Sequence, residues 1–141
     1  MSVEVEQDAH PVEPARSSRA RDAGDLALRV CGGVLSVIAT LVTVVLELLL
    51  APLRIGGHLV GVSVPVVVVA NAALGWFAIQ TVGRRWALAL PFATWFVTMA
   101  VIGAGRPEGD ILLADTWVGY ATVFAGVAVF AVQAFRLILS R

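Results

Sequence analysis

Glu47 and Asn71 are the side chains of this sequence with the clearest potential for chemistry, because both stand inside long apolar runs. A carboxylate or an amide in such a run needs a polar partner, water or an ion, so each is a candidate for proton or cation binding. Counted from the flanking arginines at about 1.5 Å per residue, Asn71 and three threonines lie at one depth of roughly 20 Å. The threonines at this depth in the candidate intramembrane polar site are Thr43, Thr98 and Thr122. Thr40 also belongs to the site, because either Thr40 or Thr43 is at the right height to bond to Asn71.

Two interpretations of this polar set stay open. The side chains either form interhelical hydrogen bonds worth about 0.6 kcal/mol each, or they line a polar constriction on the path of a substrate or ion. Glu47 has a structural interpretation, in which it extends to the outer headgroups or forms an ion pair, and a functional one, in which it is a proton or cation site. The candidate ion-pair partners are Arg54, seven residues later on the same helical face, and Arg106 from a later loop.

A second group of acids precedes the last apolar run. Glu108 and Asp110 belong to the turn-forming sequence GRPEGD at residues 105–110, and Asp115 follows it. Asp115 is placed to cap a following helix, since an acidic side chain favours the positive end of the helix dipole. The alternative is an outer acidic cluster that meets a cation or a basic partner.

Four apolar segments must position these residues. The first, at about 30–53, reaches roughly 36 Å as a helix, which is enough to cross a hydrocarbon layer of about 30 Å. Similar runs at about 59–82, 86–104 and 116–135 predict three further transmembrane helices. At about 100° per residue, one face of the first helix carries a polar seam, which lipid cannot satisfy and which we therefore expect to face other helices. Its members are Arg29, Gly33, Ser36, Thr40, Thr43, Glu47 and Arg54.

The composition agrees with a membrane protein. Hydrophobic residues make up 59% of the 141 residues, and the mean hydropathy is +0.89. We predict an all-α membrane protein whose domain at 26–141 holds four transmembrane helices as two antiparallel hairpins. Residues 1–25 are rich in charge and carry proline without apolar periodicity, so they are predicted to be a disordered cytoplasmic tail.

Several function classes lose support. The lone Cys31 and two histidines 48 positions apart form no metal-ligand pattern, so no metal and no cofactor is expected. No nucleophile and base pair suggests an enzyme. All ten basic residues are arginines at the ends of spans, which argues against nucleic acid as a partner. The expected partners are the lipid bilayer and a membrane protein or a second copy of the chain.

Arginines are distributed unequally between the two sides. Eight belong to the tail, the start of the first span, the turn at 84–85 and the C-terminus, and only Arg54 and Arg106 belong to the other loops. The positive-inside rule then predicts a multi-pass protein of the cytoplasmic (plasma) membrane with both ends in the cytoplasm.

Two family resemblances bear on this chain. Four spans with a glutamate in the first are similar to the small multidrug-resistance exporters, but Glu47 is peripheral and the arginine bias is strong, so we set that match aside. The arginine-only, Ala/Val/Gly-rich chain with GRPEGD before its final span more closely resembles uncharacterised small four-span membrane proteins of high-GC Gram-positive bacteria, over most of residues 29–138. This resemblance implies a fold and a location, and no activity.

The sequence therefore predicts a small non-enzymatic subunit or accessory partner of a membrane complex. The alternative is a small transporter or lipid-sugar translocation factor that uses Glu47 and Asn71.

Overall fold

The computed structural model describes residues 16–103 and 117–140, and this part of the chain is predominantly helical. Its elements are α1 (Arg16–Leu50), β1 (Arg54–Ile55), β2 (His58–Leu59), α2 (Ser63–Val82), the 3₁₀ helix η1 (Arg85–Leu88), α3 (Ala89–Gly103) and α4 (Trp117–Leu139). Four helical segments are long and apolar enough to cross a membrane, at Arg21–Leu50, Ser63–Val82, Arg85–Gly103 and Trp117–Leu139. The prediction of four apolar helices is confirmed to this extent.

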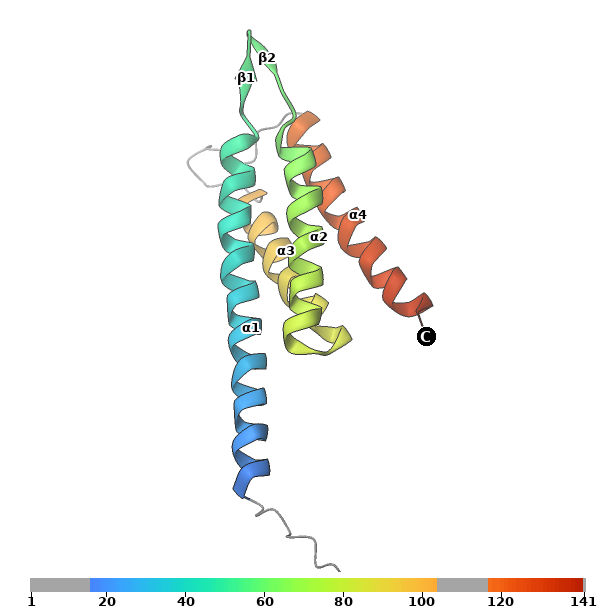
Figure 1. Cartoon of the computed structure of the whole chain (residues 1–141). Helices are drawn as coiled ribbons and strands as arrows, with labels where there is room; N and C mark the ends of the chain where they lie inside the picture. Colours follow the sequence, from blue (N-terminus) through green and yellow to red (C-terminus); the bar gives the residue numbers. More distant parts are fainter. Residues whose placement is uncertain (1–15, 104–116, 141) are drawn as a thin grey trace, which may run out of the picture.

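The helices alternate in direction along the bundle (Figure 1). α1 leads to the β1–β2 hairpin at the top of the view, α2 returns beside α1, α3 runs back behind them, and α4 descends again. α2 packs against α1 on one side and α4 on the other, while α3 packs chiefly against α1. Because the four helices alternate in direction, the start of α1 and the end of α4 lie toward the same end of the bundle. The lower part of α4 leans away from the other helices.

The first helix is longer than the sequence predicts. It starts at Arg16, so residues 16–25, predicted as part of a disordered tail, are helical, while residues 1–15 lie outside the described part. Alanine and arginine are good helix formers, and an ion pair between Asp25 and Arg29 at 2.8 Å links successive turns. The helix ends at Leu50, because Pro52 cannot donate the next backbone hydrogen bond.

The connection from α1 to α2 is a β-hairpin. Arg54 pairs with Leu59 and Ile55 with His58 in antiparallel register. The two residues of the turn are Gly56 at φ +59° and Gly57 at φ +83°, and positive φ at both positions is what a tight two-residue hairpin requires. The second helix consequently starts at Ser63 and not at the predicted residue 59.

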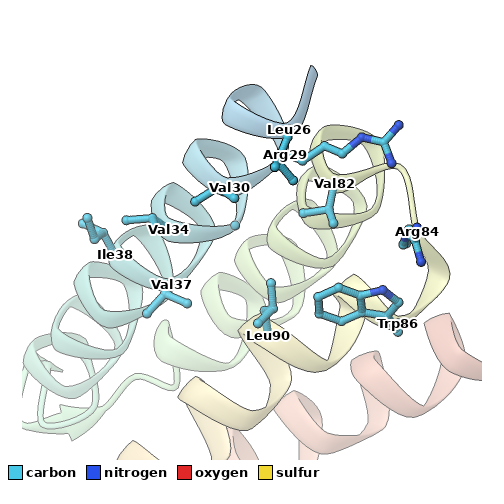
Figure 2. A pocket seen from close by; sticks show the side chains of 11 residues that line it. Leu26, Arg29, Val30, Val34, Val37, Ile38, Val82, Arg84, Trp86 and Leu90 are labelled. Carbon is cyan, nitrogen blue, oxygen red and sulfur yellow. The ribbon is translucent and has the colours of Figure 1, made fainter. Parts of the chain in front are cut away.

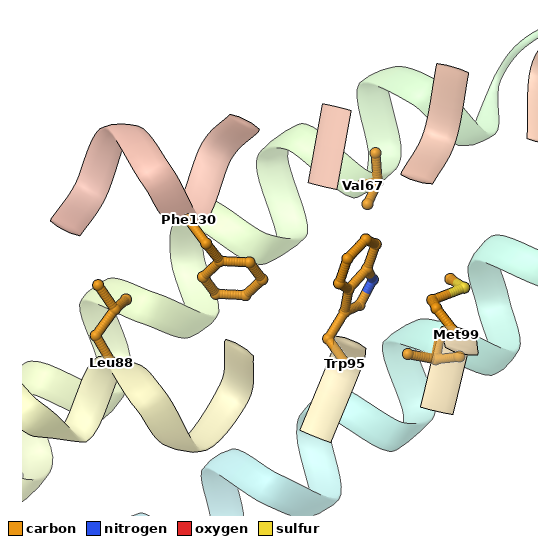
Figure 3. Close-up of a cluster of buried hydrophobic side chains, with 6 residues drawn as sticks. Val67, Leu88, Trp95, Met99 and Phe130 are labelled. Carbon is orange, nitrogen blue, oxygen red and sulfur yellow. The ribbon is translucent and has the colours of Figure 1, made fainter. Parts of the chain in front are cut away.

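The core lies where all four helices approach one another (Figure 3). Val44 of α1, Val67 of α2 and Trp95 of α3 are fully buried, and Phe130 of α4 is 3% exposed. The rings of Trp95 and Phe130 lie with their centroids 6.2 Å apart. Because lipid gives helices no hydrophobic drive toward each other, close packing of this kind must hold the bundle together in a membrane.

Candidate functional site

The polar seam of α1 faces the other helices. Ser36, Thr40 and Glu47 are all 0% exposed, and Thr43 is half-buried. Large apolar side chains such as Val42 and Leu49 cover the opposite face of the same helix and are exposed. The prediction that the seam packs against protein is therefore confirmed for Ser36, Thr40 and Glu47, but it is wrong for Arg54, which lies exposed on β1 beyond the end of α1.

Glu47 is held by a tryptophan and not by an arginine. The indole Nε1 of Trp95 donates a hydrogen bond of 2.9 Å to Glu47 Oε2, and both side chains are 0% exposed. The other oxygen, Oε1, has no hydrogen-bond partner within residues 16–103 and 117–140. The predicted pairing with Arg54 is wrong, because α1 ends at Leu50 and Arg54 lies exposed on β1. Arg106 lies outside the described residues.

A glycine of α4 makes room for this contact. A Cβ atom at Gly126 would collide with Cζ2 and Cη2 of the Trp95 indole, so only glycine allows α4 to approach the ring. Trp95 thereby lies between α1 and α4, with its ring carbons against Gly126 and its N–H on Glu47. Three helices meet through one side chain.

Asn71 is fully buried on α2, but its amide nitrogen and oxygen have no partner among the described residues. Its backbone carbonyl accepts a hydrogen bond of 3.1 Å from Gln133 Nε2 on α4. The predicted partners for the Asn71 side chain are both used elsewhere: Thr40 Oγ1 donates to Ser36 O and Thr43 Oγ1 donates to Ala39 O. These bonds stay within α1.

The other two threonines are also separated. Thr98 Oγ1 donates to Thr94 O within α3. Thr122 Oγ1 lies 2.8 Å from Val118 O and 2.8 Å from Ser63 Oγ, so the two hydroxyl groups form a hydrogen bond between α2 and α4 in which either can be the donor. Since Ser63 and Asn71 are eight residues apart on one helix, about 12 Å, Thr122 and Asn71 do not share a level as predicted.

Sequence reasoning missed three members of these contacts, namely Trp95, Ser63 and Gln133 as a partner of the Asn71 carbonyl. All three could have been noticed as polar groups inside apolar spans, although the indole N–H is hidden in a residue that counts as hydrophobic. The outer acidic cluster of Glu108, Asp110 and Asp115 lies outside the described residues. Within the described ranges, no group of three or more His, Cys, Asp or Glu side chains could hold a metal ion.

Among the open grooves on the surface of the described residues, two bear on function. One, of about 550 Å³, runs between the first half of α1 and the turn from α2 to α3. The other, of about 510 Å³, lies between α2 and α4 and has walls of Ala72, Ala125 and Ala128. Neither groove is lined by Glu47 or Asn71, although Gln133, which bonds to the Asn71 carbonyl, lines the groove between α2 and α4.

Comparison of the chain with protein-family models, with curated proteins and with solved structures finds no match. Function must therefore be argued from the geometry alone.

Proposed function

We propose that this chain is a four-span protein of the cytoplasmic membrane and acts as a small, non-enzymatic subunit or accessory partner of a larger membrane complex. The single observation that carries this proposal is the way the buried polar groups are used. Glu47–Trp95 joins α1 to α3, and Ser63–Thr122 joins α2 to α4, about 12 Å along α2 from Asn71. Polar side chains that bond to each other in pairs across neighbouring helices hold those helices together.

Both ends of the chain are proposed to be cytoplasmic. Arg29, Arg84, Arg85 and Arg136 belong to the end of the bundle where α1 starts and α4 ends, while Arg54 belongs to the hairpin at the opposite end. This arrangement supports the positive-inside orientation, since the arginine-rich end is the one retained in the cytoplasm.

The α2–α4 groove is a suitable surface for a partner helix. Its alanines keep the wall low, so another backbone can approach closely, and Phe124 at its edge is 78% exposed. A helix of a larger membrane protein or of a second copy would bury this aromatic side chain. The experiment is affinity purification of the full chain in a mild detergent, with quantitative comparison of what copurifies in a fixed ratio.

Two variants make that experiment specific. Ala128→Phe fills the α2–α4 groove, and Ala100→Phe adds the same ring to the exposed side of α3 as a matched control. The proposal predicts a stoichiometric membrane protein that is lost with Ala128→Phe and kept with Ala100→Phe. A chain that purifies alone and monomeric would contradict it.

A small transporter or lipid-sugar translocation factor is the second candidate function. The observation that favours it is that Glu47 Oε1 and both amide atoms of Asn71 are buried without a partner in the described region, as groups that bind an ion or water are. The purified chain in liposomes with a trapped pH-sensitive dye tests this function. Proton flux that Glu47→Gln or Asn71→Ala abolishes would favour the transporter, and flux equal to that of protein-free liposomes would favour the subunit.

A further inference from the structure

The groove between α1 and the turn from α2 to α3 has an unusual division of its walls (Figure 2). Along α1 it is lined by apolar side chains such as Val34 and Val37, and Trp86 and Leu90 face them from η1 and α3. At one end lie Arg29 and Arg84, and Arg29 extends toward the end of α2 beside Val82. An apolar trough therefore ends at two guanidinium groups.

The dimensions of the groove fit a lipid. From Arg29 to Ile38 α1 advances nine residues, or about 14 Å, close to the roughly 15 Å thickness of one hydrocarbon leaflet. Its volume of about 550 Å³ falls in the range of about 300–1,000 Å³ typical of small-molecule sites. A lipid whose headgroup lies at Arg29 and whose acyl chain lies in the groove would thus run from the headgroup level to the middle of the bilayer.

The charges at the polar end favour an anionic headgroup. Asp25 pairs with Arg29 at 2.8 Å and offsets part of its charge. Arg84 is exposed, and no carboxylate within residues 21–103 and 117–140 forms an ion pair with it. Arginine binds phosphate through a planar fork of N–H donors, and Trp86, 58% exposed beside it, has the amphipathic ring that prefers the headgroup level.

We infer that this groove binds one anionic phospholipid of the cytoplasmic leaflet, with the phosphate at Arg29 and Arg84 and an acyl chain along Val34, Val37 and Leu90. This inference rests on the proposed insertion of the chain with its arginine-rich end in the cytoplasm. A lipid held there would fill the space between the first half of α1 and the rest of the bundle, and so would fix the angle between them.

Trp86 provides a direct readout of the site. In full-length protein carrying Trp76→Phe and Trp117→Phe, the remaining indoles are Trp86 in the groove and the fully buried Trp95. The protein is placed in phosphatidylcholine vesicles, and phosphatidylglycerol or phosphatidylcholine with brominated acyl chains is added as quencher. Trp86→Phe in the same background leaves Trp95 as the fluorescent indole, and its fluorescence is subtracted to obtain the quenching of Trp86.

The expected result is stronger quenching of Trp86 by brominated phosphatidylglycerol than by brominated phosphatidylcholine. Arg84→Gln should lower this preference about fivefold, the factor that corresponds to the ~1 kcal/mol contributed by one arginine near an anionic surface. Arg136→Gln removes an exposed arginine from the same end of the bundle but outside this groove, and should lower it less than twofold. Val37→Phe, which fills the trough without changing charge, should reduce quenching by both lipids.

The possible failures are distinguishable. If neither brominated lipid quenches any tryptophan of the unmodified chain, the chain is not inserted and the proposed membrane function fails with the site. If both lipids quench Trp86 equally, and Arg84→Gln and Arg136→Gln behave alike, the chain is inserted but the lipid site is refuted. Quenching that falls as a concentration-dependent dimer forms would assign the groove to a second copy and overturn the inference.

Discussion

The hydrogen bond from Trp95 to Glu47 is the contact whose removal tests the structure most directly. Glu47→Leu removes the acceptor, Trp95→Phe removes the donor, and the double variant removes both. Each single change leaves a fully buried polar group without its partner, whereas the double change leaves none of the pair. The two losses of stability should therefore not add.

The size of this effect follows from the burial. Leaving a buried donor or acceptor unpaired costs about 1–3 kcal/mol, and polar pairs inside membrane proteins couple by about 0.6 kcal/mol on average and up to roughly 1.7. Both partners are 0% exposed, and the bond to Oε2 is the one hydrogen bond that the Glu47 carboxyl group makes in the described region, so we expect the upper part of that range. The double variant should be about 1.5 kcal/mol more stable than the sum of the single losses predicts.

The assay is the free energy of unfolding of the full chain, measured by titrating a denaturing detergent into mixed micelles and following helicity. Glu47→Leu combined with Trp76→Phe serves as the control, because Trp76 is 63% exposed on α2. Distant, independent changes add within about 0.5 kcal/mol, and the control should do so. A coupling below that limit for Glu47 and Trp95 would refute the argument that this pair joins α1 to α3.

Three further outcomes are expected. Gly126→Ala should destabilise the chain by about 1–3 kcal/mol in the same titration, because the added methyl group meets the Trp95 ring. Gly24→Ala, whose added methyl group would meet nothing within 4 Å, should be neutral or stabilising. Equal effects of the two variants would contradict the packing of Trp95 on Gly126. Ser63→Ala and Thr122→Val should each cost roughly 0.6 kcal/mol, and the pair should cost less than their sum, which a cycle of the three variants measures. Reporter fusions at both chain ends should be active only in the cytoplasm and a reporter in the hairpin only outside; any other pattern would reject the orientation.

Helical periodicity predicted the buried face of α1 correctly. Burial of Ser36, Thr40 and Glu47 depends only on the 3.6-residue repeat and on the inability of lipid to satisfy polar groups, and both are properties of local sequence. The partner of Glu47 could not be found in this way. It depends on which helix packs beside α1, and Trp95 reaches Glu47 only because Gly126, on a third helix, leaves space for the ring.

Depth counting failed for a related physical reason. The positions of Asn71 and Thr122 were counted from flanking arginines as if each marked the same plane, but α4 continues past Arg136 to Leu139 and leans away from α2. The hairpin could have been predicted, since two glycines between short extended pairs are a strong turn signal. The apolar run across it concealed that signal.

The length of α1 has a mechanical consequence. Its 35 residues measure about 52 Å, well beyond a hydrocarbon layer of about 30 Å, and Figure 1 shows its first turns standing clear of the other helices. A continuous helix is stiff, so these first turns move together with the part of α1 that holds Glu47, near the other end of the helix. In the proposed orientation, a tilt of these first turns would be transmitted along the same helix to Glu47 and its hydrogen bond with Trp95.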